Sequence, residues 1–267
     1  MQIHPCAKVN LGLNIVSRRP DGYHNLQTVF FPVGIFDTID IQEARQTSLT
    51  IEGHPVDGDP ERNLVMRAYR LMESRHQLPP VSITLSKHIP MQAGMGGGSS
   101  DGAFTIRLLN EMFQLRLTTP QMQAYALQLG ADCPFFITSR PAYAEGIGEQ
   151  LSPIDLSLSG YCMAIVKPPV AVSTAEAYAR IVPRMPAVNC LDVVRKPVDQ
   201  WRHLLTNDFE DSIFPLLPEI SRIKQQLYDQ GALYAAMSGS GSSVFGIFTQ
   251  APELCFDGCY TAVVELQ

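Results

Sequence analysis

The chain has 267 residues, 45% of them hydrophobic and 17% charged, which is the composition of an ordinary globular protein of one or two domains. Its formal net charge of −6 excludes a broad basic surface that neutralises phosphates, so we expect no nucleic-acid partner. Six scattered cysteines form no CxxC pair, which argues against a zinc site. Neither a signal-peptide pattern nor about 18 consecutive apolar residues occurs, so we expect a cytoplasmic protein without a membrane partner.

Short strand patterns alternate with helical ones in the first half of the chain. Runs rich in β-branched residues predict strands at residues 9–16, 28–33, 38–42 and 81–85. Apolar residues at helical spacing predict helices at residues 63–73, from Asp101 onwards, and at 119–130.

The second half is less regular. We expect a strand at residues 161–167, a helix at 173–181, a proline-rich irregular connector at 182–198, a helix at 219–230 and a strand at 244–248. A loose boundary near residue 155 predicts an N-terminal domain of residues 1–155 and a C-terminal domain of residues 156–267. Helices and strands follow one another too irregularly for a doubly wound sheet, so the pattern favours an α+β fold.

Residues 94–102, Gly-Met-Gly-Gly-Gly-Ser-Ser-Asp-Gly, have the properties of a phosphate-binding loop. Glycines let backbone N–H groups approach an anion, and the start of a helix adds partial positive charge. Either Ser99 or Ser100 is expected to cap that helix and to offer a hydroxyl group. The chain has no Gly-Lys-Ser/Thr of a Walker A loop, and GxGxxG fails because its sixth position is Ser99.

A GxSxG match centred on Ser100 raises the alternative of a hydrolase nucleophile. That motif requires a strand that ends directly at the serine, whereas the expected strand at residues 81–85 ends well before it. We therefore disfavour a hydrolase.

Residues 90–101, Pro-Met-Gln-Ala-Gly-Met-Gly-Gly-Gly-Ser-Ser-Asp, resemble the ATP-binding signature of the GHMP kinases, usually Pro-x-x-x-Gly-Leu-Gly-Ser/Gly-Ser-Ser. Residues 7–11 resemble the first motif of that family and residues 237–243 its third. The resemblance implies an N-terminal domain like the second domain of ribosomal protein S5 and a ferredoxin-like C-terminal domain. Met95, Gln92 and Gly102 depart from the usual leucine, small residue and alanine, but remove no phosphate-binding backbone group.

Residues 20–27 and 129–135 are similar to one branch of the family, and they imply the substrate. That branch transfers a phosphoryl group from ATP, the co-substrate, to the 2-hydroxyl of a cytidine diphosphate ester of methylerythritol. The resemblance implies that Asp132 accepts the proton of this hydroxyl and that Lys8 is its charged partner. A rigid turn between Gly130 and Pro134 suits such a role, and an ion pair with Lys8 would keep the carboxylate charged.

The resemblance also implies which residues bind the two ligands. The expected ATP-binding residues are Pro90, Met91, Gln92, Ala93, Gly94, Met95, Gly96, Gly97, Gly98, Ser99 and Ser100. The expected substrate-binding residues are Asn10, Tyr23, His24, Thr174 and Tyr178, with cytosine stacked between the two tyrosine rings.

Other parts of the site are less defined. Asn63 and Leu64 resemble a family segment near the nucleotide. Magnesium is expected with ATP, yet no carboxylate cluster identifies its ligands, and Ser100 and Asp101 are only candidates. The sequence carries no signal for an oligomeric state.

Two alternatives to this function stay open. One is a kinase of the same family for another alcohol, such as homoserine or mevalonate, against which residues 20–27 and 129–135 weigh. The other is a nucleotide-binding module without catalysis, against which Lys8 and Asp132 weigh.

Overall fold

The computed structural model describes residues 1–56 and 58–266, and its contacts divide the chain into two compact units. The first unit consists of Met1–Ala7, Ile35–Met91 and Gly96–Arg140. The second consists of Lys8–Gly34, Gln92–Met95 and the described part of Pro141–Gln267. These units follow spatial contacts, so the predicted domain boundary near residue 155 stays a prediction. Residues 57 and 267 of the two predicted domains lie outside the described residues.

A four-stranded sheet with the order β1-β4-β6-β5 forms one layer of the first unit. Its neighbours are antiparallel except β5 and β6, which run parallel. Side chains of β6 alternate between buried and half-buried, as expected for a strand with one face in the core. The strands are β1 (Gln2–Ile3), β4 (Thr38–Glu43), β5 (Ser48–Gly53) and β6 (Val81–Lys87).

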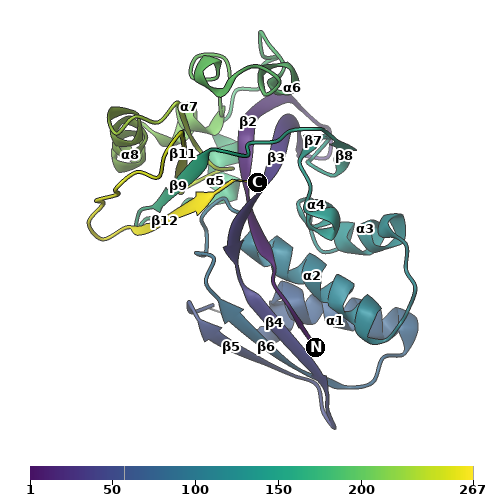
Figure 1. Ribbon diagram of the computed structural model, residues 1–267. Coiled ribbons are helices and arrows are strands. Elements are labelled where there is room, and N and C mark those ends of the chain that lie inside the picture. Colours follow the sequence, from purple (N-terminus) through teal and green to yellow (C-terminus); the bar gives the residue numbers. More distant parts are fainter. Residues whose placement is uncertain (57, 267) are drawn as a thin grey trace. The chain divides into compact units, whose positions relative to one another are not determined.

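Helices of the first unit pack beside this sheet. The two long ones, α1 (Leu64–His76) and α2 (Gly97–Met112), lie side by side (Figure 1). A Cβ atom at Gly102 would come 3.2 Å from the Cβ of Leu64, so the glycine allows the two helices to approach closely. The shorter helices are η1 (Pro60–Arg62), α3 (Thr119–Leu127) and α4 (Cys133–Thr138).

Two further sheets have the orders β2-β3-β7-β8 and β10-β11-β9-β12. Most of β2 and β3 belongs to the second unit, but the first two residues of β2 and the last two residues of β3 belong to the first unit. The strands are β2 (Cys6–Arg18), β3 (His24–Phe36), β7 (Ala142–Glu145), β8 (Gln150–Pro153), β9 (Cys162–Lys167), β10 (Tyr234–Met237), β11 (Val244–Phe248) and β12 (Tyr260–Glu265).

The longest helix of the second unit, α8 (Pro218–Asp229), packs on β10 and β11. Its buried residues Ile220, Ile223 and Leu227 follow the spacing of one helical face. They join an apolar cluster with residues from β9, β10 and β11. The remaining helices are α5 (Thr174–Ala179), α6 (Cys190–Val193), η2 (Val198–Gln200) and α7 (Phe209–Ile213).

The predicted strands and helices are confirmed, with differences in their bounds and several elements that were not predicted. The helix expected from Asp101 begins at Gly97, and the connector expected at residues 182–198 contains α6. Among the strands that were not predicted, β10 shows no alternation, because all four of its side chains are buried. The strands that were not predicted are β1, β5, β7, β8, β10 and β12, and the helices are η1, α4, α6, η2 and α7.

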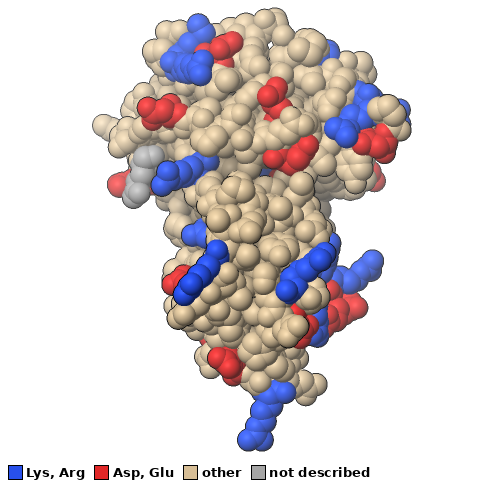
Figure 2. Space-filling view, turned by 90° about the vertical axis from the view of Figure 1, so that its right-hand side faces the viewer, with Lys and Arg blue, Asp and Glu red and all other residues tan. Residues whose placement is uncertain are grey.

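Acidic and basic side chains are interspersed on the described surface seen in Figure 2. Within the described part of the chain, none of the helices has the length and apolar character needed to cross a membrane.

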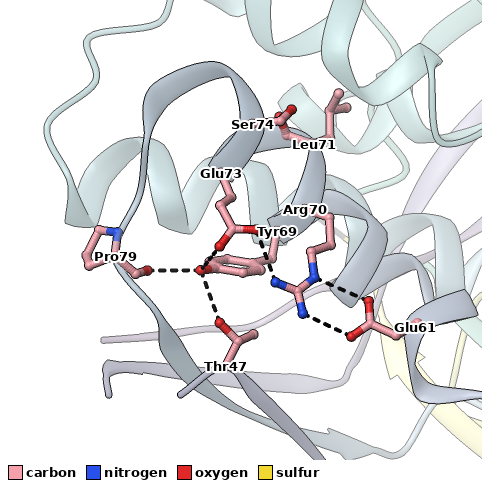
Figure 3. A network of polar contacts seen from close by, with 8 residues as sticks. All are labelled: Thr47, Glu61, Tyr69, Arg70, Leu71, Glu73, Ser74 and Pro79. Carbon is pink, nitrogen blue, oxygen red and sulfur yellow. Dashed lines mark hydrogen bonds and ion pairs between the residues drawn. The ribbon is translucent and has the colours of Figure 1, made fainter. Parts of the chain in front are cut away.

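A polar network fixes α1 to the loops around it (Figure 3). The ring of Tyr69 is fully buried, and its hydroxyl lies 3.0 Å from the Pro79 carbonyl, 3.0 Å from Glu73 and 3.2 Å from Thr47. Arg70 bonds both Glu73 and the Glu61 of η1 at the surface. Because exposed ion pairs contribute little, we expect the tyrosine to be the more important anchor.

We predict that Tyr69→Phe lowers the free energy of unfolding by about 1–2 kcal/mol, because the Pro79 carbonyl, Glu73 and Thr47 lose their shared, part-buried partner. Urea unfolding would measure this change. The fold and the catalytic rate should be retained, and a variant as stable as the wild type would contradict the anchoring role.

Candidate functional site

The glycine-rich segment leads directly into α2. Gly96 is the N-cap residue with φ of 69°, a left-handed conformation that glycine adopts without steric cost, and the helix begins at Gly97. The prediction that Ser99 or Ser100 caps this helix is therefore wrong, since both lie in its first turn. By helix geometry, the N–H groups of Gly97, Gly98 and Ser99 have no acceptor within the helix. They form the kind of N-terminus that binds anions.

A buried ionic cluster lies beneath the start of α2. Lys87, at the end of β6, bonds the carboxylates of Asp37 and Asp101, the latter at 2.8 Å. All three side chains are almost fully buried. A Cβ atom at Gly97 would lie 3.3 Å from the Lys87 ammonium, so the cluster contacts the first residue of the helix.

The cluster also shapes the chain ahead of the glycine-rich segment. One oxygen of Asp37 accepts the backbone N–H groups of His88 at 2.5 Å and Ile89 at 2.8 Å. Asp37 therefore connects the Lys87 ammonium to the two residues that precede Pro90. Sequence reasoning missed these residues, although a lysine at an inward-facing position of the 81–87 strand was a signal.

The cluster has two carboxyl groups but only one ammonium group, and this imbalance shifts the pKa values of Asp101 and Lys87. Burial raises the pKa of Asp101 to about 7, with Asp37 adding to the rise and Lys87 opposing it. Burial alone would lower the pKa of Lys87, but the two carboxylates outweigh it and the pKa is raised. Lys87 therefore stays charged at neutral pH.

A pocket of about 290 Å³ opens beside the same cluster in the first unit. Its apolar lining comes from α1, β5, β6 and the loop after β6, and the cluster residues Lys87 and Asp101 also line it. Asn63 and Leu64, which the sequence placed near the nucleotide, both lie in its wall. The other apolar side chains in the wall belong to Ile51, Val56, Pro60, Leu85 and Met91.

Asp132 and its neighbour belong to the first unit as well. Asp132 is half-buried and stands at the N-cap position of α4, with Pro134 in the first turn. Burial raises the pKa of Cys133 to about 12, so this thiol is neutral at pH 7 and unsuited to nucleophilic attack. The predicted pairing of Asp132 with Lys8 stays a prediction.

Ser100 is fully buried in the first turn of α2. Its hydroxyl has no hydrogen-bond partner among the described residues. A nucleophile elbow exposes its serine at the end of a strand, so this burial within a helix argues against the hydrolase alternative.

The second unit holds Lys8 on β2 in a set of polar contacts. Its ammonium donates to Asn10 at 2.6 Å and to the carbonyl of Gly94 at 3.3 Å, and it lies 5.0 Å from the centre of the Phe30 ring. Asn10 donates in turn to Thr28 at 2.9 Å. The structure thus brings together three of the predicted residues: the lysine, the asparagine and one glycine of the loop.

Gly94 is also in close contact with the serine-glycine loop at residues 238–243. Its φ is 71°, and a Cβ atom there would lie 1.9 Å from the carbonyl oxygen of Ser238. Its own carbonyl accepts the Ser238 hydroxyl at 2.9 Å. Only glycine fits at this position, because any side chain would collide with the backbone of the facing loop.

Two of the predicted substrate-binding rings contact each other in the second unit. His24 stacks on Tyr178 with ring centres 5.1 Å apart, and Phe209 meets the same tyrosine edge-on at 4.9 Å. Burial and the nearby Arg18 lower the pKa of His24, so the ring is neutral at pH 7. Tyr23 is exposed on the turn before β3.

Thr174, the remaining predicted substrate residue, begins α5. Its hydroxyl lies 3.1 Å from that of Ser240 in the serine-glycine loop.

Comparisons with known proteins can be set beside this geometry. The model of the GHMP kinases N terminal domain matches residues 63–140, and that of the GHMP kinases C terminal matches residues 192–255. The chain belongs to the GHMP kinase family. The predicted family, the α+β fold of its members and the assignment as a kinase are confirmed.

Relatives with curated names cover nearly the whole chain. One from Bacteroides fragilis, named 4-diphosphocytidyl-2-C-methyl-D-erythritol kinase, is 49% identical over 98% of each chain. Another of that name from Bacteroides thetaiotaomicron is 53% identical over 91% of this chain and 90% of its own.

Solved structures agree with the fold. A crystal structure titled 4-(cytidine 5'-diphospho)-2C-methyl-D-erythritol kinase is 34% identical, with a TM-score of 0.79 over 92% of this chain and 89% of that one. A homoserine kinase from Cytophaga hutchinsonii covers 100% of this chain and 94% of its own with a TM-score of 0.71, but at 14% identity it shows the fold alone.

The buried cluster leads to a prediction about pH. In the folded protein Asp101 keeps its proton up to about pH 7, whereas in the unfolded chain it loses the proton near 3.8. Between these values the folded form holds one proton more, so stability falls as pH rises. Asp101→Asn should remove a fall of about 2–3 kcal/mol between pH 5 and pH 8.

Urea unfolding at several pH values would measure this slope. Asp155→Asn, at an exposed aspartate, is the matched control and should leave the slope unchanged. An Asp101→Asn protein with the wild-type slope would contradict the prediction.

Proposed function

We propose that the protein transfers the γ-phosphoryl group of ATP to the 2-hydroxyl of 4-diphosphocytidyl-2-C-methyl-D-erythritol, giving ADP and the 2-phosphate. The observation that carries this proposal is the Lys8 ammonium on the Gly94 carbonyl. A buried cation is held there by the segment that resembles the ATP signature. The names of relatives that are 44–53% identical support the same reaction.

The donor fits the first turn of α2. Phosphate oxygens would accept the N–H groups of Gly97, Gly98 and Ser99, helped by the positive end of the helix dipole. Adenine would enter the pocket of the first unit, where an apolar wall receives its ring and Asn63 offers polar groups. These assignments extend the predicted ATP-binding set by the pocket residues.

Phosphoryl transfer requires positioning and charge rather than covalent help from the protein. The 2-hydroxyl oxygen forms a bond to the γ-phosphorus while the bond from phosphorus to the β-phosphate oxygen breaks. Asp132 would accept the hydroxyl proton, and Lys8 would stabilise the negative charge on the transferred group. The desolvated position of Lys8 strengthens this effect, because its field is little screened by water.

The cytidine end of the substrate fits the aromatic residues of the second unit. Cytosine would stack on the rings of Tyr23 and Tyr178, and neutral His24 would hydrogen-bond the base edge. Asn10 and Thr174 are proposed to face the erythritol hydroxyls.

Magnesium is expected to accompany the nucleotide. Among residues 1–56 and 58–266, no three His, Cys, Asp or Glu side chains form a group that could hold a metal ion. The partnerless hydroxyl of buried Ser100 fits a ligand to an ion that phosphates otherwise coordinate. Lys87 holds one oxygen of Asp101, and the other oxygen, which has no partner among the described residues, fits a second ligand. When bound, the ion would neutralise phosphate charge.

The alternatives receive less support. Homoserine and mevalonate kinases with this fold are 14% identical to the chain, far below the relatives that carry the proposed name. A module without catalysis has no need to bury Lys8 against two acceptors.

An assay of the purified protein tests the proposal. With ATP and 4-diphosphocytidyl-2-C-methyl-D-erythritol we expect ADP and a singly phosphorylated product, followed by phosphorus NMR, and no turnover of homoserine or mevalonate. Asp132→Asn should lower kcat by about 10²–10⁴-fold and Lys8→Met by about 10²–10³-fold.

The Tyr69→Phe variant is the control, with a change in stability but not in kcat. The proposed function fails if the wild type leaves the cytidine substrate unphosphorylated. The proposed roles fail if either variant keeps nearly full activity.

A further inference from the structure

Four consecutive side chains, Asn207-Asp208-Phe209-Glu210, connect three parts of the second unit. They lie at the start of α7, in a segment that the sequence motifs of the family did not single out. The last three contacts run from Asp208 to the N–H of Ile15, from Phe209 to the ring of Tyr178, and from Glu210 to the N–H of Met237. The segment therefore connects β2, the aromatic residues and β10.

Asn207 has the most specific role of the four. It is buried, and its side-chain amide donates to the carbonyl of Met237 at 2.7 Å and to that of Gly239 at 2.8 Å. Its side-chain oxygen accepts the N–H of Phe209 at 3.0 Å. Both amide hydrogens and the oxygen are thus used, and no carboxylate could replace them because it has no hydrogen to donate.

The two carbonyls that Asn207 holds flank Ser238. The Ser238 hydroxyl donates to the carbonyl of Gly94, and the same carbonyl accepts the ammonium of Lys8. A second contact joins the loops, because the N–H of Ser243 donates to the carbonyl of Ala93 at 3.3 Å. Hydrogen bonds and chain neighbours therefore link Asn207 to Lys8 without a gap.

The orientation of the ammonium depends on this link. A lysine ammonium has three N–H donors. Asn10 and the Gly94 carbonyl each accept a hydrogen bond from the ammonium of Lys8. The Gly94 carbonyl, itself held by Ser238, is one of the acceptors that set the orientation of the ammonium.

We propose that Asn207 is a positioning residue for phosphoryl transfer, which fixes the Ser238–Ser243 loop so that the Gly94 carbonyl orients the Lys8 ammonium. The inference rests on the proposed function, in which Lys8 stabilises the transferred group. Asn207 acts through other residues and does not contact the substrate. Its loss should therefore lower kcat while leaving KM for the cytidine substrate nearly unchanged.

Asn207→Asp tests the proposal in the full-length protein. The variant keeps the shape and the acceptor for Phe209 but loses both donors. We expect kcat to fall about 10–100-fold, the effect of a small displacement at a reacting centre. KM for the cytidine substrate should stay within about twofold of the wild type, since uniform binding is unchanged.

Asn189→Asp is the matched control. Asn189 caps a helix of the second unit, accepts the N–H of Leu191 two positions on, as Asn207 accepts that of Phe209, and donates to Tyr143 at 2.9 Å, but it holds no carbonyl of the serine-glycine loop. Its variant should keep the wild-type kcat. An Asn207→Asp protein that also keeps full kcat would overturn the proposal, as would a fall in kcat matched by Asn189→Asp.

Ser238→Ala provides a second test that removes a single hydroxyl. It should also lower kcat with little change in KM. If Asn207→Asp does not fold, this variant tests the proposal by itself. In the double variant the two effects should not multiply, because both act on the same carbonyl. Independent, multiplying effects or an unchanged kcat in Ser238→Ala would refute the link.

The activity of the wild type separates a failure of the positioning role from a failure of the proposed function. A wild type active on the cytidine substrate, with fully active Asn207→Asp, rejects the positioning role and leaves the proposed function intact. A wild type inactive on that substrate rejects both.

Discussion

The close approach of two backbones at Gly94 is the constraint on which the second unit's site depends. The carbonyl of Ser238 occupies the space that a side chain at Gly94 would need, and the Ser238 hydroxyl bonds the Gly94 carbonyl in return. That carbonyl is also an acceptor for the buried Lys8 ammonium. Burying a lysine is unfavourable unless its donors are satisfied, so the position of this peptide group, together with Asn10, helps to set the position of the cation.

The first unit holds a second group of buried charges, at the start of α2. A buried lysine between two carboxylates is costly to desolvate, and such clusters often contribute little net stability. Here the cluster connects the end of β6, the residues before Pro90 and the first turn of the helix. Its benefit is a defined geometry at the place where phosphate groups would meet backbone N–H groups.

Local chemistry explains which features could be predicted from the sequence. The phosphate-binding character of residues 94–102 and most helices followed from composition and spacing, and Lys8 and Asp132 followed from family resemblance. Asn207 was not predictable, because its bonds reach carbonyls 30 and 32 positions further along the chain. The sequence showed Gly102 only as a departure from the usual alanine, since the proximity of Leu64 is a property of packing. Alternation also fails for strands such as β10, which are buried on both faces.

The contacts that hold the glycine-rich segment explain why it needs so few side chains. Its approach is held by Asp37 at His88 and Ile89, its middle by the serine-glycine loop at Ala93 and Gly94, and its helical end by Lys87 at Asp101. Apart from the Asp101 side chain, these anchors use backbone groups. The glycines therefore need no side chains of their own, and by helix geometry the N–H groups of Gly97, Gly98 and Ser99 have no acceptor within the helix. Rigidity supplied from outside would let a segment of small residues bind an anion without the entropy loss of ordering a flexible loop.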